Sequence, residues 1–297
     1  MSKLLRADFM CLLKNRYLWM CMAFVVAVTA LQAMIESAFV IPEYVMFEGA
    51  TYLSITISVF IGMFIGTQYN EGTFRNKILT GHSRWSLYFA NLIVCVAAAL
   101  IFYTLSILTT AGVAVILQWK FGMQAGQLFP LILSGIGPVL VYTALFTVID
   151  MLVGKRAESL VFSILLVFLL SGISTKIDTE LLLYQENFGP TLANYLDEDG
   201  KVKTKMMDAE KKPDTKTKVK HEVYQFLNNV LPPCQFTQIA NIPSDAEKMQ
   251  MWEKRGFDTT DYENQIENVK IIPLYAALFI LVILAAGGFL FEIKNLK

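Results

Sequence analysis

Histidine and cysteine are the side chains best able to ligate metal or act as nucleophiles, and this chain has few of them. Its histidines are His82 and His221. His221-Glu222 lacks the second histidine that an HExxH zinc motif requires, and His82 lies in a basic loop, where we interpret it as a solvated residue. The four cysteines form no CxxC pair and lie mostly in or beside apolar runs, which is typical of buried core residues. We therefore expect no metal site in this chain.

Motifs of enzymes and ATP-binding proteins are also absent from the sequence. There is no G-x-S-x-G nucleophile elbow. There is no G-x-x-x-x-G-K-S/T loop, so the chain does not cradle ATP phosphates in that manner. Glu36 and Asp150 lie at the ends of apolar runs, and we interpret both as solvated at a membrane interface. These features predict a non-enzymatic protein with no cofactor of its own.

The elements that position the remaining residues are long apolar runs. The chain is 55% hydrophobic and 17% charged, whereas a soluble domain is closer to a quarter charged. A hydrocarbon core of ~30 Å needs about 20 helical residues with few charges. The runs that meet this requirement are residues 17–35, 50–67, 87–117, 129–149, 159–175 and 271–291. The sequence therefore predicts an all-α integral membrane protein with six transmembrane helices.

Residues 1–16 precede the first span and are amphipathic. Leu5, Phe9, Leu12 and Leu13 can share one helical face, while the basic residues lie elsewhere. This pattern predicts a helix that lies in the membrane interface. The alternative is a cytoplasmic extension of the first span.

The distribution of lysine and arginine predicts the orientation. Segments 1–16, 68–86, 150–158 and 292–297 would lie on one side, and they are rich in basic residues. Those residues are Lys3, Arg6, Lys14, Arg16, Arg75, Lys77, Arg84, Lys155, Arg156, Lys294 and Lys297. Because short cytoplasmic loops carry an excess of such residues, both termini should be cytoplasmic. We expect contact with membrane lipids and no nucleic-acid partner.

Four regions follow from this plan: residues 1–16, the first five spans with their loops in 17–175, an extracellular insertion at 176–270, and the last span and tail in 271–297. Within the insertion, the charged stretch 197–220 predicts a flexible hairpin or loop. A helix over 219–231 should stop at Pro232-Pro233. A second helix should begin at the capping box of Ser244 and Glu247 and stop at Gly256.

The predicted helix 219–231 has apolar residues at helical spacing. They are Val223, Phe226, Leu227 and Val230. Four such side chains would be costly to leave in water, at about 0.8 kcal/mol per methylene. We therefore expect this face to lie near the outer membrane surface, where it would cap the exit of a transport pathway.

The loop 68–86, between the second and third spans, carries the most specific motif. Gly72-Thr73 can start a short helix with Thr73 as its cap, and Gly81 can end it. Phe74, Ile78 and Leu79 would project one way, and the basic side chains another. Such a helix suits a groove on a soluble partner. The alternative is a basic turn that binds anionic headgroups.

The stretch from Glu71 to Arg84, EGTFRNKILTGHSR, resembles the loop after the second span in ABC-2 type permeases. These are the membrane subunits of bacterial ABC transporters that handle peptides, antibiotics or lipids. The six-span plan and the large external segment are similar too. Residues 226–238 resemble the membrane-proximal external element of bacitracin and lantibiotic-type members.

This resemblance implies a protein of the bacterial cytoplasmic membrane. It would work with a separate ATPase subunit, present in two copies, and that subunit would bind ATP and magnesium. The coupling helix on that ATPase would consist of Glu71, Gly72, Thr73, Phe74, Arg75, Asn76 and Lys77. A second permease chain, identical or related, would complete an exporter; import stays open. The rival hypothesis is a sensor or scaffold whose external domain binds a ligand and signals inward without transport.

Small residues and proline mark positions of close packing or bending. Gly62-x-x-x-Gly66 permits close contact with another helix, in a dimer or within the chain. Gly135, Gly137 and Pro138 should weaken or kink the fourth span.

Overall fold

The computed structural model describes residues 2–37, 41–123, 125–188, 191–196, 202–207, 213–253 and 260–293. Within these residues the chain is helical apart from one two-stranded hairpin. Six of the described helical segments are long and apolar enough to cross a membrane. The prediction of an all-α, multi-pass membrane protein with six spans is therefore confirmed.

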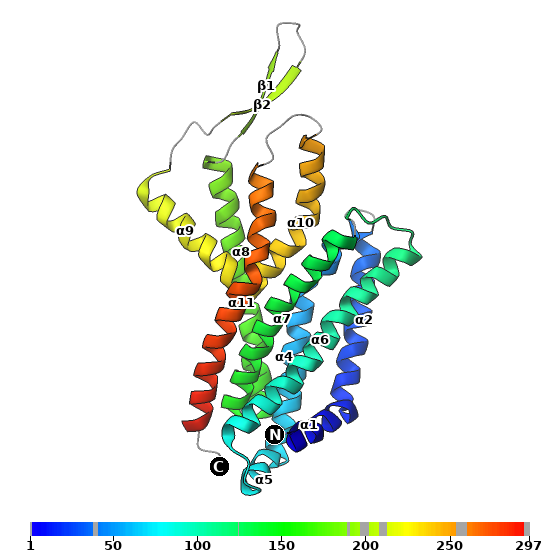
Figure 1. The fold of residues 1–297 in the computed structure, drawn as a ribbon, viewed down its shortest axis with the longest axis vertical. Helices are drawn as coiled ribbons and strands as arrows, with labels where there is room; N and C mark the ends of the chain where they lie inside the picture. Colours follow the sequence, from blue (N-terminus) through cyan, green and yellow to red (C-terminus); the bar gives the residue numbers. More distant parts are fainter. Residues whose placement is uncertain are drawn as a thin grey trace.

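The long helices run roughly along the long axis of the molecule, and the strands lie beyond one end of the bundle (Figure 1). The first half of the chain contains α1 (Ser2–Lys14), α2 (Arg16–Glu36), α3 (Pro42–Glu48), α4 (Ala50–Asn70), α5 (Thr73–Leu79), α6 (Arg84–Ile116) and α7 (Ala125–Val153). The second half contains α8 (Arg156–Phe188), β1 (Thr191–Leu196), β2 (Val202–Met207), α9 (Thr215–Val230), α10 (Pro232–Glu253) and α11 (Thr260–Ile293). The candidate spans lie in α2, α3–α4, α6, α7, α8 and α11.

Helices α4 and α7 form the centre of the bundle. They are the most buried of the six spans, whereas α2, α8 and α11 bury little of their surface and lie at the periphery. Helix α7 packs against α4, α6, α8 and α11. The core between these helices is rich in aromatic side chains, with Phe60 stacked on Phe64 and edge-on to Phe102.

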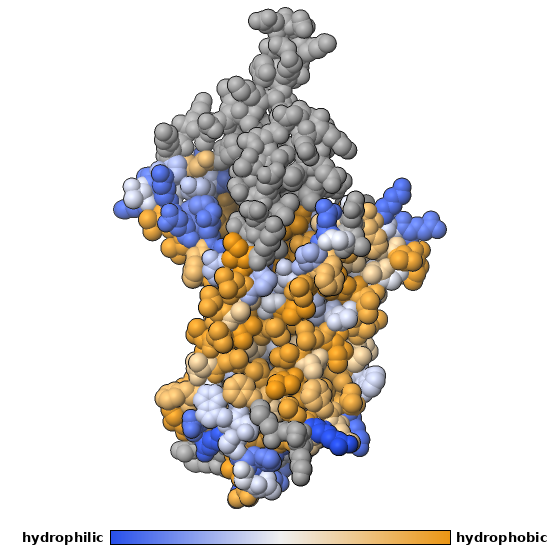
Figure 2. Space-filling model, viewed as in Figure 1, coloured by the Kyte–Doolittle hydropathy of each residue, from blue (hydrophilic) through white to orange (hydrophobic). Residues whose placement is uncertain are grey.

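The outer surface of the bundle is a broad apolar band with polar residues at both ends (Figure 2). Exposed side chains in the band include Leu31 on α2, Phe162 and Leu165 on α8, and Leu281 on α11. An exposed apolar surface of this extent is what a lipid bilayer would cover.

Helix α1 is separate from α2 and lies across the end of the bundle (Figure 1). The two are divided at Asn15, whose side chain accepts a hydrogen bond of 2.8 Å from the backbone N–H of Tyr17. A separate helix is therefore observed in place of a simple extension of the first span, and its position in the membrane interface stays a prediction. Its buried face contains Leu4, Asp8 and Leu12, whereas Leu13 is exposed, contrary to the predicted grouping.

The GxxxG motif of α4 packs within the chain. A Cβ atom on Gly66 would lie 2.8 Å from the Arg156 Cα, and one on Gly62 would lie 2.8 Å from a methyl group of Leu160. These two glycines therefore let α8 approach α4 closely. Of the two predicted uses of the motif, contact in a dimer or contact within the chain, the structure shows contact within the chain. In α7, Gly135 lies directly against the Tyr103 side chain, and the helix continues through Pro138.

The segment between α8 and α11 extends beyond the apolar band. Strands β1 and β2 pair antiparallel, with Thr191 opposite Met207 and Leu196 opposite Val202. This hairpin lies at the far end of the molecule from α5 (Figure 1), and we call these the hairpin end and the α5 end. The stretch 197–220 was predicted to be a flexible hairpin or loop: residues 202–207 form β2 of this hairpin, whereas residues 215–220 begin helix α9, and residues 197–201 and 208–212 lie outside the described residues.

Helix α9 begins after the side chain of Asp214 caps it and ends before Pro232-Pro233, as predicted. The predicted helix start at Ser244 is wrong, because α10 runs without a break from Pro232 to Glu253 and includes Pro243. Its first turns pack against α3 and α7, and tertiary packing of this kind outweighs a local capping signal. Gly256, the predicted stop, lies outside the described residues.

Candidate functional site

The short helix α5 and the residues that fasten it form the candidate site. Gly72 has a φ of +67° at the N-cap, and Gly81 has a φ of +91° just after the C-cap residue Thr80. Glycine tolerates this left-handed backbone at little cost, so the two glycines let the chain leave α4, make two turns of helix and enter α6. The predicted cap Thr73 is wrong by one position, because Gly72 occupies the N-cap without a side-chain hydrogen bond.

The aromatic residue of α5 points into the bundle. Phe74 is 2% exposed, stacks on Tyr69 at a centroid distance of 4.4 Å and meets Phe291 of α11 edge-on at 6.4 Å. The hydroxyl of Tyr69 donates a hydrogen bond of 2.6 Å to the Met151 carbonyl oxygen. Phe74 therefore ties α5 to α4, α7 and α11 and is not available to a partner protein.

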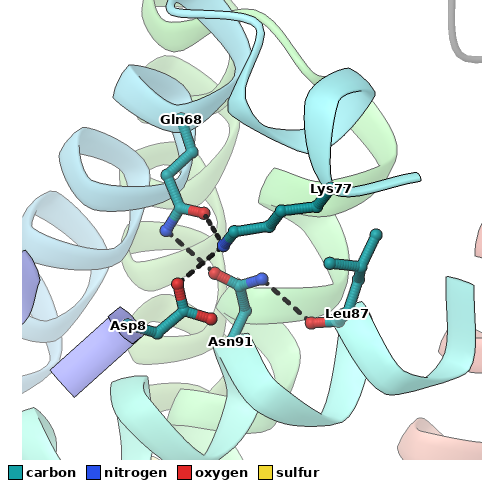
Figure 3. Close-up of polar contacts among 5 residues, drawn as sticks. All are labelled: Asp8, Gln68, Lys77, Leu87 and Asn91. Carbon is teal, nitrogen blue, oxygen red and sulfur yellow. Dashed lines mark hydrogen bonds and ion pairs between the residues drawn. The ribbon is translucent and has the colours of Figure 1, made fainter. Parts of the chain in front are cut away.

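Lys77 anchors the other face of α5 through a buried polar network (Figure 3). Its ammonium group donates to Asp8 Oδ1 of α1 at 2.6 Å and to Gln68 Oε1 of α4 at 3.1 Å. Gln68 Nε2 donates in turn to Asn91 Oδ1 of α6 at 2.9 Å, and Asn91 Nδ2 donates to the Leu87 carbonyl oxygen at 2.9 Å. The network links four helices at one point.

Burial makes this anchor energetically important. The side chain of Asp8 is 3% exposed and that of Lys77 is 14% exposed. Asp8 Oδ2 accepts no hydrogen bond from the described residues, so Lys77 is the main compensation for the buried carboxylate. Removing one partner of a buried ion pair typically costs about 3–5 kcal/mol. Disturbance of Lys77 would therefore loosen α1 and α5 together.

The outward side of α5 presents a small mixed surface. Its exposed residues, which we call the α5 tip, are Glu71, Arg75, Asn76, Leu79 and Thr80. Leu79 is 75% exposed at its centre. The sequence placed Leu79 beside Phe74, but five residues at 100° each turn it to a different face. The α5 tip thus combines an apolar side chain with charges of both signs.

Basic residues surround the α5 end. Arg84, at the start of α6, donates a hydrogen bond of 2.8 Å to the Glu292 carbonyl oxygen of α11. Arg156, at the start of α8, donates one of 2.6 Å to the Tyr17 hydroxyl of α2. Arginine side chains therefore tie helix ends together around α5.

The second set of predicted residues lies on α9, next to the bundle. Phe226 meets Tyr275 of α11 edge-on at 6.4 Å, and α9 packs against α8, α10 and α11. Leu227 and Val230 are half-buried, whereas Phe226 and Val223 are mostly exposed. The face thus lies beside the spans at the hairpin end, and it covers them incompletely.

Neighbouring residues shift the pKa values of two titratable side chains on α9. A hydrogen bond of 2.7 Å to Glu180 raises the pKa of Lys220. Burial lowers the pKa of His221, whose ring stacks on Tyr184 of α8 at 3.7 Å. These contacts hold α9 to α8.

Asp150 differs from its predicted surroundings. It is 1% exposed, and the hydroxyl groups of Ser163, at 2.9 Å, and Ser159 donate to its Oδ1 atom. The prediction of a solvated interface residue is therefore wrong, because the turn between α7 and α8 folds the carboxylate back between helices. Glu36, its predicted counterpart, is partly exposed.

The sequence missed three members of the anchor: Asp8, Gln68 and Asn91. Asn91 is the residue from which a buried polar network could have been predicted, because an amide inside an apolar span needs a hydrogen-bonding partner. Within the described residues no three histidine, cysteine or acidic side chains are grouped to hold a metal ion.

Comparison with known proteins adds no family to this description. No protein-family model matches the sequence, and no curated protein matches it significantly.

Proposed function

We propose that this chain is the permease subunit of an ATP-driven transporter of the ABC-2 type, and that α5 receives force from a separate ATPase subunit. The observation that carries the proposal is the arrangement of α5, with an exposed tip and a buried anchor. A coupling element needs both a surface for its partner and a stiff connection to the helices that it moves.

The anchor supplies the stiff connection. Through Lys77, motion of α5 would reach α1, α4 and α6, and through Phe74 it would reach α11. These contacts are buried, and close-packed interiors transmit displacement rather than absorb it. A push on the α5 tip would therefore tilt several spans together.

The basic α5 end supports a cytoplasmic location for α5, for α1 and for the last turns of α11, which lie at this end in Figure 1. On this orientation the hairpin end, within residues 176–270, is extracellular. The membrane is then the bacterial cytoplasmic membrane, the location of the permeases whose loop the Glu71–Arg84 stretch resembles.

The exporter would contain further subunits. Two ATPase copies would bind ATP and magnesium, and a second permease, identical or related, would complete the pathway. Peripheral helices α2, α8 and α11 expose apolar surface that such a subunit or lipid would cover. A peptide, antibiotic or lipid-like molecule is the substrate class that the resemblance favours.

The proposal is tested by expressing the chain together with its genomic neighbours, by asking whether an ATPase co-purifies, and by measuring the ATP hydrolysis of the complex. Leu79→Asp should abolish both association and stimulated hydrolysis, because it places a charge at the centre of the α5 tip. The control is Ile116→Asp, which alters a side chain that is 79% exposed at the opposite end of α6. Equal effects of the two substitutions would reject α5 as the docking element.

The sensor or scaffold hypothesis is favoured by one observation. Helix α8 continues as a single helix from the α5 end to Phe188, where the hairpin follows, so a ligand bound there has a rigid connection inward. Ligand binding without any stimulation of ATP hydrolysis would favour this hypothesis over transport.

A further inference from the structure

A cavity opens among the helices near the hairpin end, at the opposite end of the bundle from α5. Its volume is about 440 Å³, and residues of α2, α3, α4, α7, α8 and α10 line it. The side chains that define its chemistry are Glu36, Glu48, Asp178, Tyr44, Tyr52 and Asn241. A cavity of this volume is in the usual range for small-molecule sites and is much larger than a metal ion needs.

Acidic side chains are concentrated in the lining. Three of the described lining residues are carboxylates, and none of those residues is a lysine or arginine. Gln32 Nε2 donates to Glu36 Oε1 at 3.2 Å and to Glu48 Oε2 at 3.3 Å, so one neutral amide bridges two acidic groups. Like charges so close repel each other, and a cation between them would remove the repulsion.

One carboxylate oxygen of the cavity is unpaired among the described residues. Glu36 Oε2 is a buried atom that accepts no hydrogen bond from the described residues. By contrast, Glu48 Oε1 accepts one of 3.3 Å from the Tyr44 hydroxyl. An unpaired buried acceptor costs about 1–3 kcal/mol, and more when charged. A ligand that donates a hydrogen bond at this position would satisfy it.

Aromatic side chains form other parts of the wall. Tyr44, Tyr52 and Tyr142 line the cavity together with Phe47. The faces of such rings attract ammonium and guanidinium groups, and their apolar bodies accommodate the carbon chain that bears them. A wall of this composition suits an organic cation better than a bare metal ion.

We infer that this cavity binds an organic cation that carries ammonium or guanidinium groups, such as the side chains of a basic peptide. The positive groups lie among Glu36, Glu48 and Asp178, and the carbon chain contacts the tyrosines. The cavity is distinct from the α5 tip, and its occupancy requires no ATPase. Failure of this inference would therefore leave the proposed coupling role of α5 untouched.

The test uses the purified full-length chain in lipid nanodiscs and isothermal titration calorimetry. The probe is N-acetyl-diarginine amide, and its control is N-acetyl-dicitrulline amide, in which a neutral urea group replaces each guanidinium. Saturable binding of the arginine peptide, at least tenfold tighter than that of the citrulline peptide, is expected. Equal binding of the two peptides, or no binding of either, would overturn the inference.

The carboxylates are tested by Glu36→Gln and Asp178→Asn, which preserve size and remove charge. Each should weaken binding of the arginine peptide by about tenfold, the effect of losing one charge-assisted hydrogen bond. Glu158→Gln, at the α5 end of the same helix as Asp178, is the matched control and should leave binding unchanged. Thermal unfolding of each variant checks the fold. Unchanged binding in both folded cavity variants would overturn the inference.

Discussion

Substitution of Lys77 by methionine tests the anchor of α5. The change preserves the length of the apolar side chain and removes the ammonium group that compensates Asp8. Because the Asp8 side chain is 3% exposed, its carboxylate would be left buried beside an empty donor position. Removing one partner of a buried ion pair typically lowers the free energy of unfolding by about 3–5 kcal/mol. We take the lower part of this range, about 3 kcal/mol, because Lys77 itself keeps some exposure.

The assay is equilibrium unfolding of the purified chain in mixed micelles by titration with SDS, followed by circular dichroism. The control is Lys155→Met, which breaks the exposed Lys155–Glu158 pair at the same end of the molecule. Exposed pairs contribute about 0–1 kcal/mol, so the two variants should differ by about 2 kcal/mol or more. The double variant Lys77→Met with Asp8→Asn should recover part of the loss. Equal stability of the two lysine variants would refute a stabilising buried pair.

Three further predictions follow from packing and protonation. Phe74→Ala should destabilise the chain by about 3–5 kcal/mol in the same titration, because it empties a buried aromatic site; a loss below 1 kcal/mol would contradict its burial. Gly66→Val should lower the free energy of unfolding by about 1–3 kcal/mol, because the new Cβ would meet the α8 backbone. Gly172→Ala should cause no such loss, because the space around Gly172 is open. Burial lowers the pKa of His221, so the unfolded state binds its proton more readily, and local stability of α9 should fall as pH drops below about 6.5. Hydrogen exchange of α9, corrected for intrinsic rates, should accelerate from pH 7.5 to 5.5 and lose this dependence in His221→Phe; the same acceleration in both proteins would contradict it.

The spans and the existence of α5 could be predicted because they depend on local pattern. Apolar runs of membrane length and a glycine on each side of residues 73–79 are visible in the sequence alone. The helix α9 likewise follows from its spacing and from the prolines that succeed it. The predicted helix start at Ser244 is wrong because a capping motif reports only on local sequence. The contacts of α10 with α3 and α7 join distant parts of the chain, and the local sequence does not show them.

The anchor and the cavity could not be predicted because their members are far apart in the sequence. Asp8 and Lys77 are separated by 69 positions, and no spacing rule connects them. The acidic cavity unites α2, α3 and α8 in the same way. Asp150 was assigned to the interface because its position at the end of an apolar run gave no sign that α8 folds over it.

Site-specific cross-linking tests the central claim, that α5 contacts an ATPase, most directly. Leu79→Cys in a Cys11→Ser background would present one engineered exposed thiol at the α5 tip, with Ile116→Cys as the control; Cys21, Cys95 and Cys234 are buried. With the ATPase that the proposal requires co-expressed in membranes, a short bifunctional reagent should join it to the Leu79→Cys chain and not to the control, and ATP should alter the yield. The absence of any cross-link from Leu79→Cys, with the ATPase present and active, would contradict the account.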